Sequence, residues 1–331
     1  MILAADVGGT KVNLALFDPE RASPLRPEQL ERFASADYPS LEAIIGAYCH
    51  SHGLPILAAC VGIAGPVVDG RCQGPNLPWS VDLRDLQREL DLDNVALIND
   101  LEATAYGLAV LTESDFCTLN QGLADSRGNM ALIAAGTGLG EAIIFRGAGR
   151  PLISASEGGH CDFAPGSAEE IELLRYLLPS SPHVSWDHLV SGPGLGNIYR
   201  FLRDTHRAEE PAWLAEALRG TDLAAVISEL ALEDRSPLCC RALELFVALY
   251  GAEAGNLALK ALACGGITLG GGIAPKILPA LRRGGFMKRF VAKGRMQSLL
   301  AEMPVRVILN PRTALLGAAR YARLSLPEGN P

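Results

Sequence analysis

The sequence predicts an α/β protein with two related halves, and three observations support that prediction. Short apolar segments of strand length alternate with segments of helical periodicity along the chain. A unit of strand, Gly/Thr-rich turn and strand occurs at residues 2–17 and again at residues 130–145. No stretch rich in Pro, Ser or charge separates the halves, so we expect them to pack around a cleft, where ligand sites tend to form.

The composition is that of a folded protein with a substantial core. Hydrophobic residues make up 49% and charged residues 20% of the 331 residues, a length that suits roughly two domains. The 29 basic and 37 acidic residues give a net charge of −8, and no run of Lys or Arg concentrates positive charge. A nucleic-acid partner is therefore not expected.

Cysteine usage and the apolar segments predict a cytoplasmic protein without a membrane partner. The eight cysteines include no CxxC pair, which favours free thiols in a reducing compartment. The N-terminus meets an acid at Asp6 and lacks the basic start of a secretory signal. The apolar stretch 254–275 is interrupted by Asn256, Lys260 and several glycines, so it predicts a buried helix followed by a strand.

The predicted elements follow from apolar periodicity and from turn residues. The two hairpins have strands at 2–6 and 12–17, and at 130–135 and 141–145. Further strands are expected at 56–61, 95–99, 267–269 and 305–309, and helices at 101–111, 237–262 and 313–324. The phrase Ser191-Gly192-Pro193-Gly194 predicts that a helix over 187–202 stops and restarts.

The turn Asp6-Val7-Gly8-Gly9-Thr10 is a candidate phosphate site. A purely structural hairpin turn with glycines at positive φ would show the same sequence pattern. Glycines allow backbone amides to approach a phosphate, Thr10 can donate a hydrogen bond, and Asp6 can lie near a hydrated metal. The turn over 136–140 offers the same chemistry with Thr137, and 270–272 is a third glycine-rich turn. Three such turns favour phosphate binding over a purely structural role.

Several familiar nucleotide and catalytic motifs are absent from the sequence. The patterns GxxxxGK(S/T) and GxGxxG do not occur, which excludes a P-loop NTPase, the common dinucleotide fingerprint and the protein-kinase glycine loop. The patterns HExxH and GxSxG are also missing. A bound nucleotide would therefore be held by the hairpin turns.

Asn99-Asp100 follows a predicted apolar strand and precedes a predicted helix. Ligands of α/β sheets bind at the carboxyl ends of strands, where a carboxylate suits acid–base work. The alternative is that Asp100 caps the helix that follows it.

Glu157-Gly158-Gly159-His160 places an acid and an imidazole around two glycines, which suits a polyhydroxylated ligand. A turn with a hydrogen-bonded histidine is the structural alternative. A zinc site is not expected, because Cys161 has no companion cysteine at ligand spacing.

Five segments resemble, in order, the motifs of the sugar kinase, Hsp70 and actin superfamily. They are phosphate-1 at 6–10, connect-1 at 95–107, phosphate-2 at 135–140, adenosine at 269–276 and connect-2 at 314–320. More specifically, the chain resembles bacterial glucokinases of the proteobacterial type over residues 1 to about 322. The matching phrases are Ile98-Asn99-Asp100, 136–140, 157–165 and 189–195. The chain lacks the cysteine-rich zinc motif typical of ROK sugar kinases, which indicates the non-ROK branch.

The resemblance implies two actin-like (ribonuclease H-like) α/β domains, with mixed sheets and helices, flanking a cleft that holds the active site. Residues 1–110 plus about 303–324 would form the smaller domain, and 111–302 the larger. The implied activity is the ATP-dependent phosphorylation of D-glucose to glucose 6-phosphate, a glycolytic reaction. The implied partners are D-glucose and MgATP, and the implied assembly is a homodimer.

The resemblance also implies roles for individual residues. Asp100 would be the general base for the sugar 6-hydroxyl. The sugar would be bound by Asn76, Asn99, Glu157, His160 and Asp187. The phosphates would be held by Gly8, Gly9, Thr10, Gly136, Thr137 and Gly138, and the adenosine by Gly271 and Gly272. Asp6 would contact Mg²⁺ through water, and no protein metal-ligand set is expected.

One position departs from the family pattern, and two other functions remain open. The family usually has Glu where this chain has Asp187, a side chain with about 1.5 Å less reach, which bears on sugar affinity and epimer selectivity. The alternatives are a kinase for another hexose, such as mannose or glucosamine, and a catalytically silent sugar sensor. Repressors of this kind carry a helix-turn-helix before the first hairpin, which here begins at residue 2.

Overall fold

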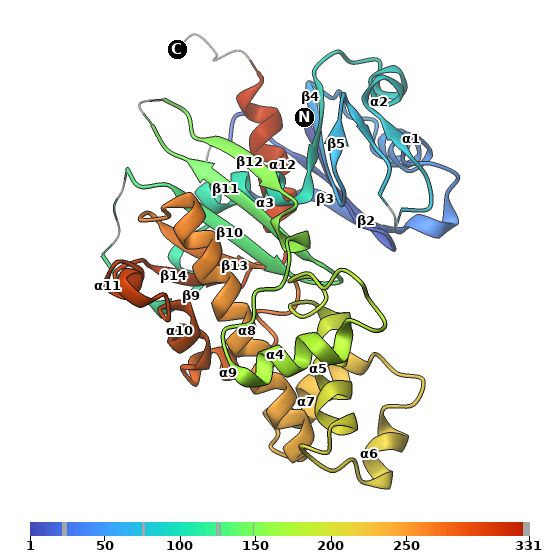
Figure 1. The fold of residues 1–331 in the computed structure, drawn as a ribbon. Helices are drawn as coiled ribbons and strands as arrows, with labels where there is room; N and C mark the ends of the chain where they lie inside the picture. Colours follow the sequence, from blue (N-terminus) through green and yellow to red (C-terminus); the bar gives the residue numbers. More distant parts are fainter. Residues whose placement is uncertain (22–24, 75–76, 124, 126, 148, 327–331) are drawn as a thin grey trace. The chain divides into compact units, whose positions relative to one another are not determined.

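The computed structural model describes residues 1–21, 25–74, 77–123, 125, 127–147 and 149–326, which fold into two compact units (Figure 1). Unit 1 comprises Met1–Asp115 together with Asn310–Pro331, and unit 2 comprises Phe116–Leu309. Each unit has its own sheet and its own core.

The main sheet of unit 1 has five strands in the order β3-β2-β1-β4-β8. In sequence order they are β1 (Ile2–Val7), β2 (Lys11–Phe17), β3 (Glu28–Ala34), β4 (Ala58–Ile63) and β8 (Val95–Asn99). β1 pairs antiparallel with β2 and parallel with β4, which pairs parallel with β8. Every residue of β4 is buried, as expected for a strand covered on both faces.

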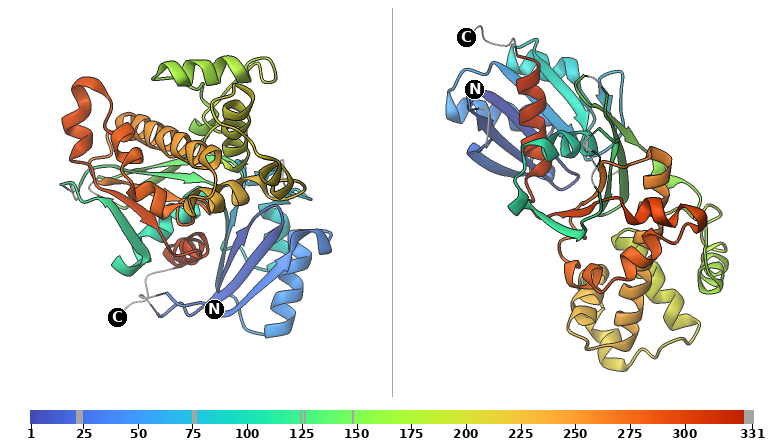
Figure 2. Two further views of the ribbon diagram at one scale, coloured as in Figure 1. Left: turned by 90° about the horizontal axis from the view of Figure 1, so that it is seen from below. Right: turned by 90° about the vertical axis from the view of Figure 1, so that its left-hand side faces the viewer.

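Helices cover both faces of this sheet. Leu3 and Ala5 of β1 belong to one core cluster with α1 (Leu41–His52) and α2 (Leu83–Leu90), whereas Ile2 and Ala4 belong to another with α3 (Asp100–Gly107) and α12 (Thr313–Leu324). This alternation follows from the two-residue period of a strand. α3 and α12 lie side by side (Figure 2). A Cβ at Gly317 would overlap the backbone oxygen of Ala103, so this approach requires glycine.

A small second sheet in unit 1 contains β5 (Val67–Val68), β6 (Arg71–Cys72) and β7 (Val81–Asp82). Its last strand leads into α2, whose first turn is capped by the Asp82 side chain accepting from Arg84 N at 2.9 Å.

The sheet of unit 2 repeats the strand arrangement of unit 1. Its order is β12-β11-β10-β13-β14-β9. The strands are β9 (Phe116–Asn120), β10 (Met130–Ala135), β11 (Leu139–Phe145), β12 (Leu152–Ser156), β13 (Gly266–Gly270) and β14 (Val305–Ile308). The first five strands in this spatial order match β3-β2-β1-β4-β8 in both order and direction, and β9 is an addition. This match confirms the two related halves predicted from the repeated hairpin.

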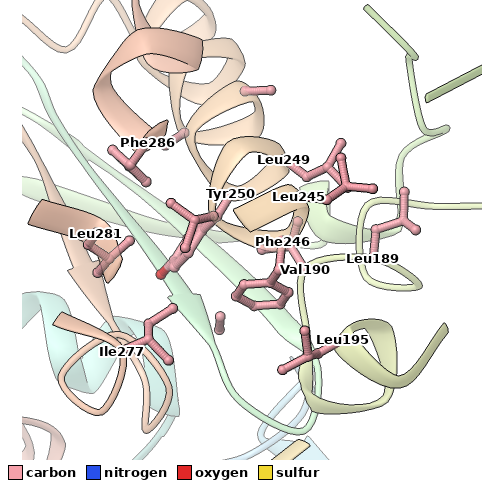
Figure 3. Close-up of a cluster of buried hydrophobic side chains, with 14 of the residues drawn as sticks. Leu189, Val190, Leu195, Leu245, Phe246, Leu249, Tyr250, Ile277, Leu281 and Phe286 are labelled. Carbon is pink, nitrogen blue, oxygen red and sulfur yellow. The ribbon is translucent and has the colours of Figure 1, made fainter. Parts of the chain in front are cut away.

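The core of unit 2 is built on α8 (Pro237–Ala261), which runs across the sheet against β10 and β13 (Figure 1). Figure 3 shows Phe246 and Tyr250 of α8 among leucine and isoleucine side chains from other elements. The Tyr250 hydroxyl donates to Ile133 O of β10 at 3.2 Å, so this buried polar group is satisfied.

The other helices of unit 2 contribute buried side chains to the same core. They are α4 (Ala168–Leu177), α5 (Gly192–Asp204), α6 (Ala212–Ala217), α7 (Leu223–Leu232), α9 (Leu278–Arg282), α10 (Gly285–Phe290) and α11 (Gln297–Ala301). Short 3₁₀ turns are η1 (Ser35–Asp37), η2 (Leu108–Val110), η3 (Glu113–Asp115), η4 (Gly158–His160) and η5 (Gly294–Met296). α5, α7 and α10 contact α8 directly.

One sequence prediction needs correction. Residues 187–190 are not helical, and the Ser191 hydroxyl caps α5 by accepting from Gly194 N at 3.1 Å. The phrase 191–194 therefore begins a helix and does not restart one. The two compact units divide at 115 and 310, where the sequence suggests domain boundaries at 110 and about 303. β14 lies in unit 2 because it hydrogen-bonds to β13 and β9.

Among the described residues, α8 is the one helix long and apolar enough to cross a membrane by length and composition. Its most apolar window is 78% buried inside the structure, as in the core helix of a folded domain. This agrees with the buried helix predicted for the start of the 254–275 stretch, and β13 is the predicted strand after it.

Candidate active site

The carboxyl ends of β1, β4 and β8 meet at one edge of the unit 1 sheet. Val7 pairs with Ile63, and Ile63 pairs with Asn99. Asp6 and Asp100 therefore lie at the same edge, two strands apart, a spacing of about 10 Å for neighbouring strands about 4.8 Å apart. This edge is where ligands of α/β sheets bind.

Asn99, and not Asp100, supplies the cap of α3. Asn99 Oδ1 accepts from Leu101 N at 2.8 Å, and Asn99 N donates to Oε2 of Glu102 at 3.1 Å, which makes a capping box. Asn99 Nδ2 also donates to Gly65 O at 3.0 Å. Asn99 therefore performs most of the helix-capping role that was the structural alternative for Asp100.

Asp100 is the first residue of α3, and its Oδ1 accepts from Leu101 N at 2.9 Å. The N-terminal end of a helix favours negative charge, so a carboxylate is well supported there. Its charge reaches the small sheet of unit 1: burial raises the pKa of the Cys72 thiol, and the negative charge of Asp100 adds to that shift. Asp100 therefore offers a carboxylate at a ligand-binding edge.

The first hairpin turn holds the candidate phosphate residues of unit 1. Gly8 N donates to Lys11 O at 2.9 Å, and the Ser35 hydroxyl donates to Gly8 O at 3.2 Å. These bonds fix the backbone of Gly8, Gly9 and Thr10 between β1 and β2. Thr10 itself is exposed, as a phosphate ligand must be.

Asp6 lies at the start of this turn, and its Oδ2 accepts from Asn13 Nδ2 at 3.1 Å. Burial raises the pKa of Asp6, while the hydrogen bond from Asn13 and the charge of Lys11 oppose that shift. A divalent cation nearby would favour the ionised carboxylate further, so the residue suits a water-mediated contact to Mg²⁺.

In unit 2 three segments of the predicted site are joined by hydrogen bonds. Gly192 N at the start of α5 donates to Gly136 O at 2.8 Å. Leu139 N donates to Asp187 Oδ1 at 2.6 Å, and Asp187 N donates to Gly159 O at 2.8 Å. The turn over 136–138, the turn over 157–160 and the segment before α5 are therefore held together.

Glu157 and His160 flank the short turn η4 and face outward. Their side chains are 66% and 61% exposed, and Glu157 Oε2 lies 3.9 Å from His160 Nε2. The two glycines between them pack closely on β11: a Cβ at Gly159 would overlap Leu139 O, and one at Gly158 would overlap the Glu141 carboxylate. The sequence Glu-Gly-Gly-His thus presents two polar side chains on a turn that lies directly on the sheet.

Unit 2 also contains a cavity of about 720 Å³, large enough for a nucleotide. It begins at Gly136 and Thr137 of the second hairpin turn and extends to Gly272 and Lys276. The remaining walls come from α5, from Asp222 at the cap of α7 and from α7 itself, and they include Asn197, Arg200, Ala225 and Ser228. Phosphate-type and adenosine-type segments thus line one cavity.

Gly271 shapes this cavity through its backbone. Its φ is +78°, and a Cβ there would overlap Ala135 O at the end of β10. Only glycine combines that conformation with that approach. Ile273 N then donates to Ala135 O at 3.2 Å, which fixes the turn against the sheet.

The contribution of α5 and α7 to the walls of this cavity was not predicted from the sequence. The Ser-Gly-Pro-Gly phrase shows where α5 begins, but its position beside Gly136 depends on a contact between distant segments. α7 has no motif that would mark it as ligand-lining. Asn76, expected to bind the sugar, lies outside the described residues.

Within the residues that the structure describes, no group of three or more His, Cys, Asp or Glu side chains is arranged to hold a metal ion.

Known proteins agree with this arrangement. The glucokinase family model matches residues 3–325. The chain is 41% identical to a glucokinase of Nostoc punctiforme, covering 97% of this chain and 98% of that protein. It is 42% identical to a glucokinase of Synechocystis sp., with 98% of each chain covered.

Solved structures give the same result. A glucokinase from an Antarctic psychrotroph has a TM-score of 0.84 at 31% identity, covering 98% of this chain and 99% of that one. A ROK family glucokinase from Streptomyces griseus, solved with glucose and AMPPNP, shares the fold with a TM-score of 0.65 at 23% identity, covering 98% and 99%. The two α/β halves have the actin-like fold of these sugar kinases. The chain belongs to the glucokinase family.

Proposed function

We propose that this protein transfers the γ-phosphoryl group of MgATP to the 6-hydroxyl of D-glucose, giving glucose 6-phosphate and ADP. Family membership over residues 3–325 is the observation that carries this conclusion. The cavity lined by Gly136, Thr137, Gly272 and Lys276 supplies space for the nucleotide.

Asp100 is the proposed general base. As the sugar O6 attacks the γ-phosphorus, the O6–P bond forms, the bond from phosphorus to the β,γ-bridging oxygen breaks, and the O6 proton passes to the Asp100 carboxylate. Phosphoryl transfer depends mainly on positioning and charge stabilisation, so a carboxylate fixed at the start of α3 is sufficient.

The proposed sugar ligands are Asn76, Asn99, Glu157, His160 and Asp187. Exposed carboxylate and imidazole groups can accept and donate to neighbouring hydroxyls, which is what a hexose requires. Asn99 uses Oδ1 and Nδ2 in the scaffold, so its contribution to the sugar is limited to its remaining N–H and lone pair.

The proposed phosphate contacts are the backbone amides of Gly9 and Gly138 and the hydroxyls of Thr10 and Thr137. Gly8 and Gly136, whose N–H groups donate to Lys11 O and Gly138 O, would let the phosphates approach the turns closely. Gly271 and Gly272 would border the adenosine. Asp6 would orient a water of the Mg²⁺ that arrives with ATP, and that ion would neutralise charge on the phosphates.

A coupled assay tests this function. Purified protein is supplied with MgATP and with glucose, mannose, fructose or glucosamine. ADP release is followed for each sugar, and glucose-6-phosphate dehydrogenase reports the product from glucose. NADPH formation with glucose, at a kcat/KM well above that for the other hexoses, supports the proposal. ADP release with another hexose alone would indicate a different hexokinase, and no release with any sugar would indicate a sugar sensor.

Assembly as a homodimer and a cytoplasmic location are also proposed, on the basis of the family resemblance. Sedimentation of the purified protein checks the first, and a dimer mass of twice 35.0 kDa is expected.

A further inference from the structure

Two glutamates of unit 2 form a buried acid pair. Glu141 of β11 is 1% exposed and Glu253 of α8 is 0% exposed. The Oε1 atoms of both side chains are buried without a hydrogen-bond partner among the described residues, and the charge of the neighbouring Glu253 raises the pKa of Glu141. Two buried carboxylates repel, so this proximity requires that the pair hold one proton between them.

The surroundings of the pair place the negative charge on Glu253. Its Oε2 accepts from Asn256 Nδ2 at 2.8 Å, and its Oε1 lies 3.7 Å from Lys260 Nζ. Lys293 Nζ donates to Asn256 Oδ1 and so adds a second cation to this side. These are the charged groups that act on the pair within the described residues. They oppose the burial that raises the pKa of Glu253, which favours the proton on Glu141.

The other side of the pair contacts the turn that carries Glu157 and His160. A Cβ at Gly158 would lie 3.0 Å from Cδ of Glu141 and would overlap its Oε2. Gly158 N donates to the Ser156 hydroxyl at 3.1 Å, and Ser156 is the residue paired with Glu141 in the β11–β12 ladder. The turn over 157–160 therefore packs against the carboxyl group of Glu141.

We propose that Glu141 and Glu253 are positioning residues for the sugar: the singly protonated pair holds the 157–160 turn in its binding geometry, and loss of the shared proton moves the turn and weakens glucose binding. This inference rests on the proposed sugar contacts of Glu157 and His160. The pair would make the affinity for sugar depend on pH without contacting the sugar directly.

Burial raises the pKa of Glu141 to about 8, and repulsion from Glu253 adds to the shift, whereas Lys260 opposes it. If glucose binds the protonated form, its KM rises about tenfold for each pH unit above that pKa. The pair does not line the nucleotide cavity, so the KM for MgATP is expected to change by less than about twofold over the same range.

The test compares wild type, Glu141→Gln and Glu253→Gln by steady-state kinetics from pH 6.5 to 9. In wild type the glucose KM rises about tenfold between pH 7 and 9, while kcat stays level. Glu141→Gln removes the titrating carboxyl and keeps a hydrogen-bonding side chain, so the rise disappears in this variant. Glu253→Gln removes only the repulsion that adds to the shift, so its rise moves to lower pH. A wild-type KM that stays flat to pH 9, or a rise that persists in Glu141→Gln, overturns the proposal.

Two controls separate this effect from other causes. Cys161→Ser removes a neighbouring exposed thiol and should retain the rise. Glu170→Gln removes another buried acid, paired with Arg289 at 2.7 Å, and should also retain it. Loss of the rise in Cys161→Ser would assign it to the thiol and contradict the acid pair.

A second measurement needs no variant, in case the glutamine substitutions prevent folding. The increase in Tm of wild type on adding glucose should shrink from pH 7 to pH 9, and the increase on adding MgATP should not. Equal behaviour of the two ligands contradicts the proposal. An active enzyme with a flat glucose KM would overturn the positioning role alone, whereas absence of phosphorylation at every pH would overturn the proposed function.

Discussion

The Asp187 carboxylate accepts a hydrogen bond from the backbone N–H of Leu139 at 2.6 Å. The same residue donates its own N–H to Gly159 O, so it connects the turn after β10 to the turn that carries Glu157 and His160. A side chain expected to bind sugar is therefore also part of the scaffold. Within the described part of the chain Oδ2 has no hydrogen bond, which leaves it for a sugar hydroxyl.

Substitutions of Asp187 should separate these two roles. Asp187→Asn keeps an oxygen that can accept from Leu139 but loses the charge, so the glucose KM rises while Tm changes little. Asp187→Ala loses both and leaves the Leu139 N–H unpaired, so stability also falls by about 1–2 kcal/mol. Kinetics and thermal unfolding of both variants check this. Equal Tm values for the two variants would contradict the scaffold role.

Asn99→Ala should lower activity through the position of Asp100. The substitution removes the cap of α3 and the bond to Gly65 O, at a cost of about 1–2 kcal/mol in stability. Because Asp100 is the next residue, kcat should fall as well. Ser40→Ala is the matched control, since it removes the cap of α1 and should leave kcat unchanged. An equal kcat for the two variants would show that the cap does not position the base.

Gly271→Ala should damage the nucleotide cavity, whereas Gly272→Ala should preserve the fold. A Cβ at Gly271 requires φ near +78° and overlaps Ala135 O, which costs about 1–3 kcal/mol. A Cβ at Gly272 meets nothing within 4 Å. Thermal unfolding should therefore show a lower Tm for the first variant alone, together with a higher KM for MgATP. A wild-type Tm for Gly271→Ala would contradict the requirement for glycine at this position.

The acid pair also predicts how stability depends on pH. The pKa of Glu141 is raised from 4.5 to about 8 on folding, so its stabilising contribution is complete below about 4.5 and is lost as pH rises through about 8. Glu141→Gln lacks that loss. Its Tm relative to wild type should thus increase from pH 5 to pH 8, by the equivalent of about 1–3 kcal/mol.

Glu244→Gln, an exposed substitution on α8, is the control for this pH series and should show a constant difference from wild type. A difference for Glu141→Gln that does not change between pH 5 and pH 8 would mean that the native pair does not retain the proton.

Much of the fold could be predicted from local sequence. β8 and α12 match the predicted 95–99 and 313–324 exactly in their bounds, since an apolar run and a helical period marked both. The repeated hairpin predicted two related halves, and the two main sheets share the same strand order. Edge strands such as β3, whose residues are mostly exposed, gave no apolar signal and were not predicted. β14 was predicted as a strand, but its assignment to unit 2 depends on pairing with distant strands.

The candidate site could be predicted in its motifs but not in its connections. Asp100, Glu157 and His160 could be identified because each forms a recognisable motif with the residues next to it in the sequence. The link from Asp187 to Leu139, and the contact of Glu141 with Gly158, join residues far apart in the chain or on opposite sides of a turn. Glu141 in particular appears in the sequence as a polar residue in an ordinary strand. Its proposed role depends on its proximity to Glu253, which lies more than 100 residues later in the chain.

The most direct test of the account is the kcat of Asp100→Asn with glucose and MgATP. The asparagine oxygen can still accept from Leu101 N, so the local structure should be kept. Asp82→Asn, a substitution of the same type at the cap of α2, is the control and should retain wild-type kcat. We predict that kcat of Asp100→Asn falls by about 10²–10⁴-fold while glucose still raises its Tm. A kcat within about twofold of wild type would contradict the assignment of Asp100 as the base.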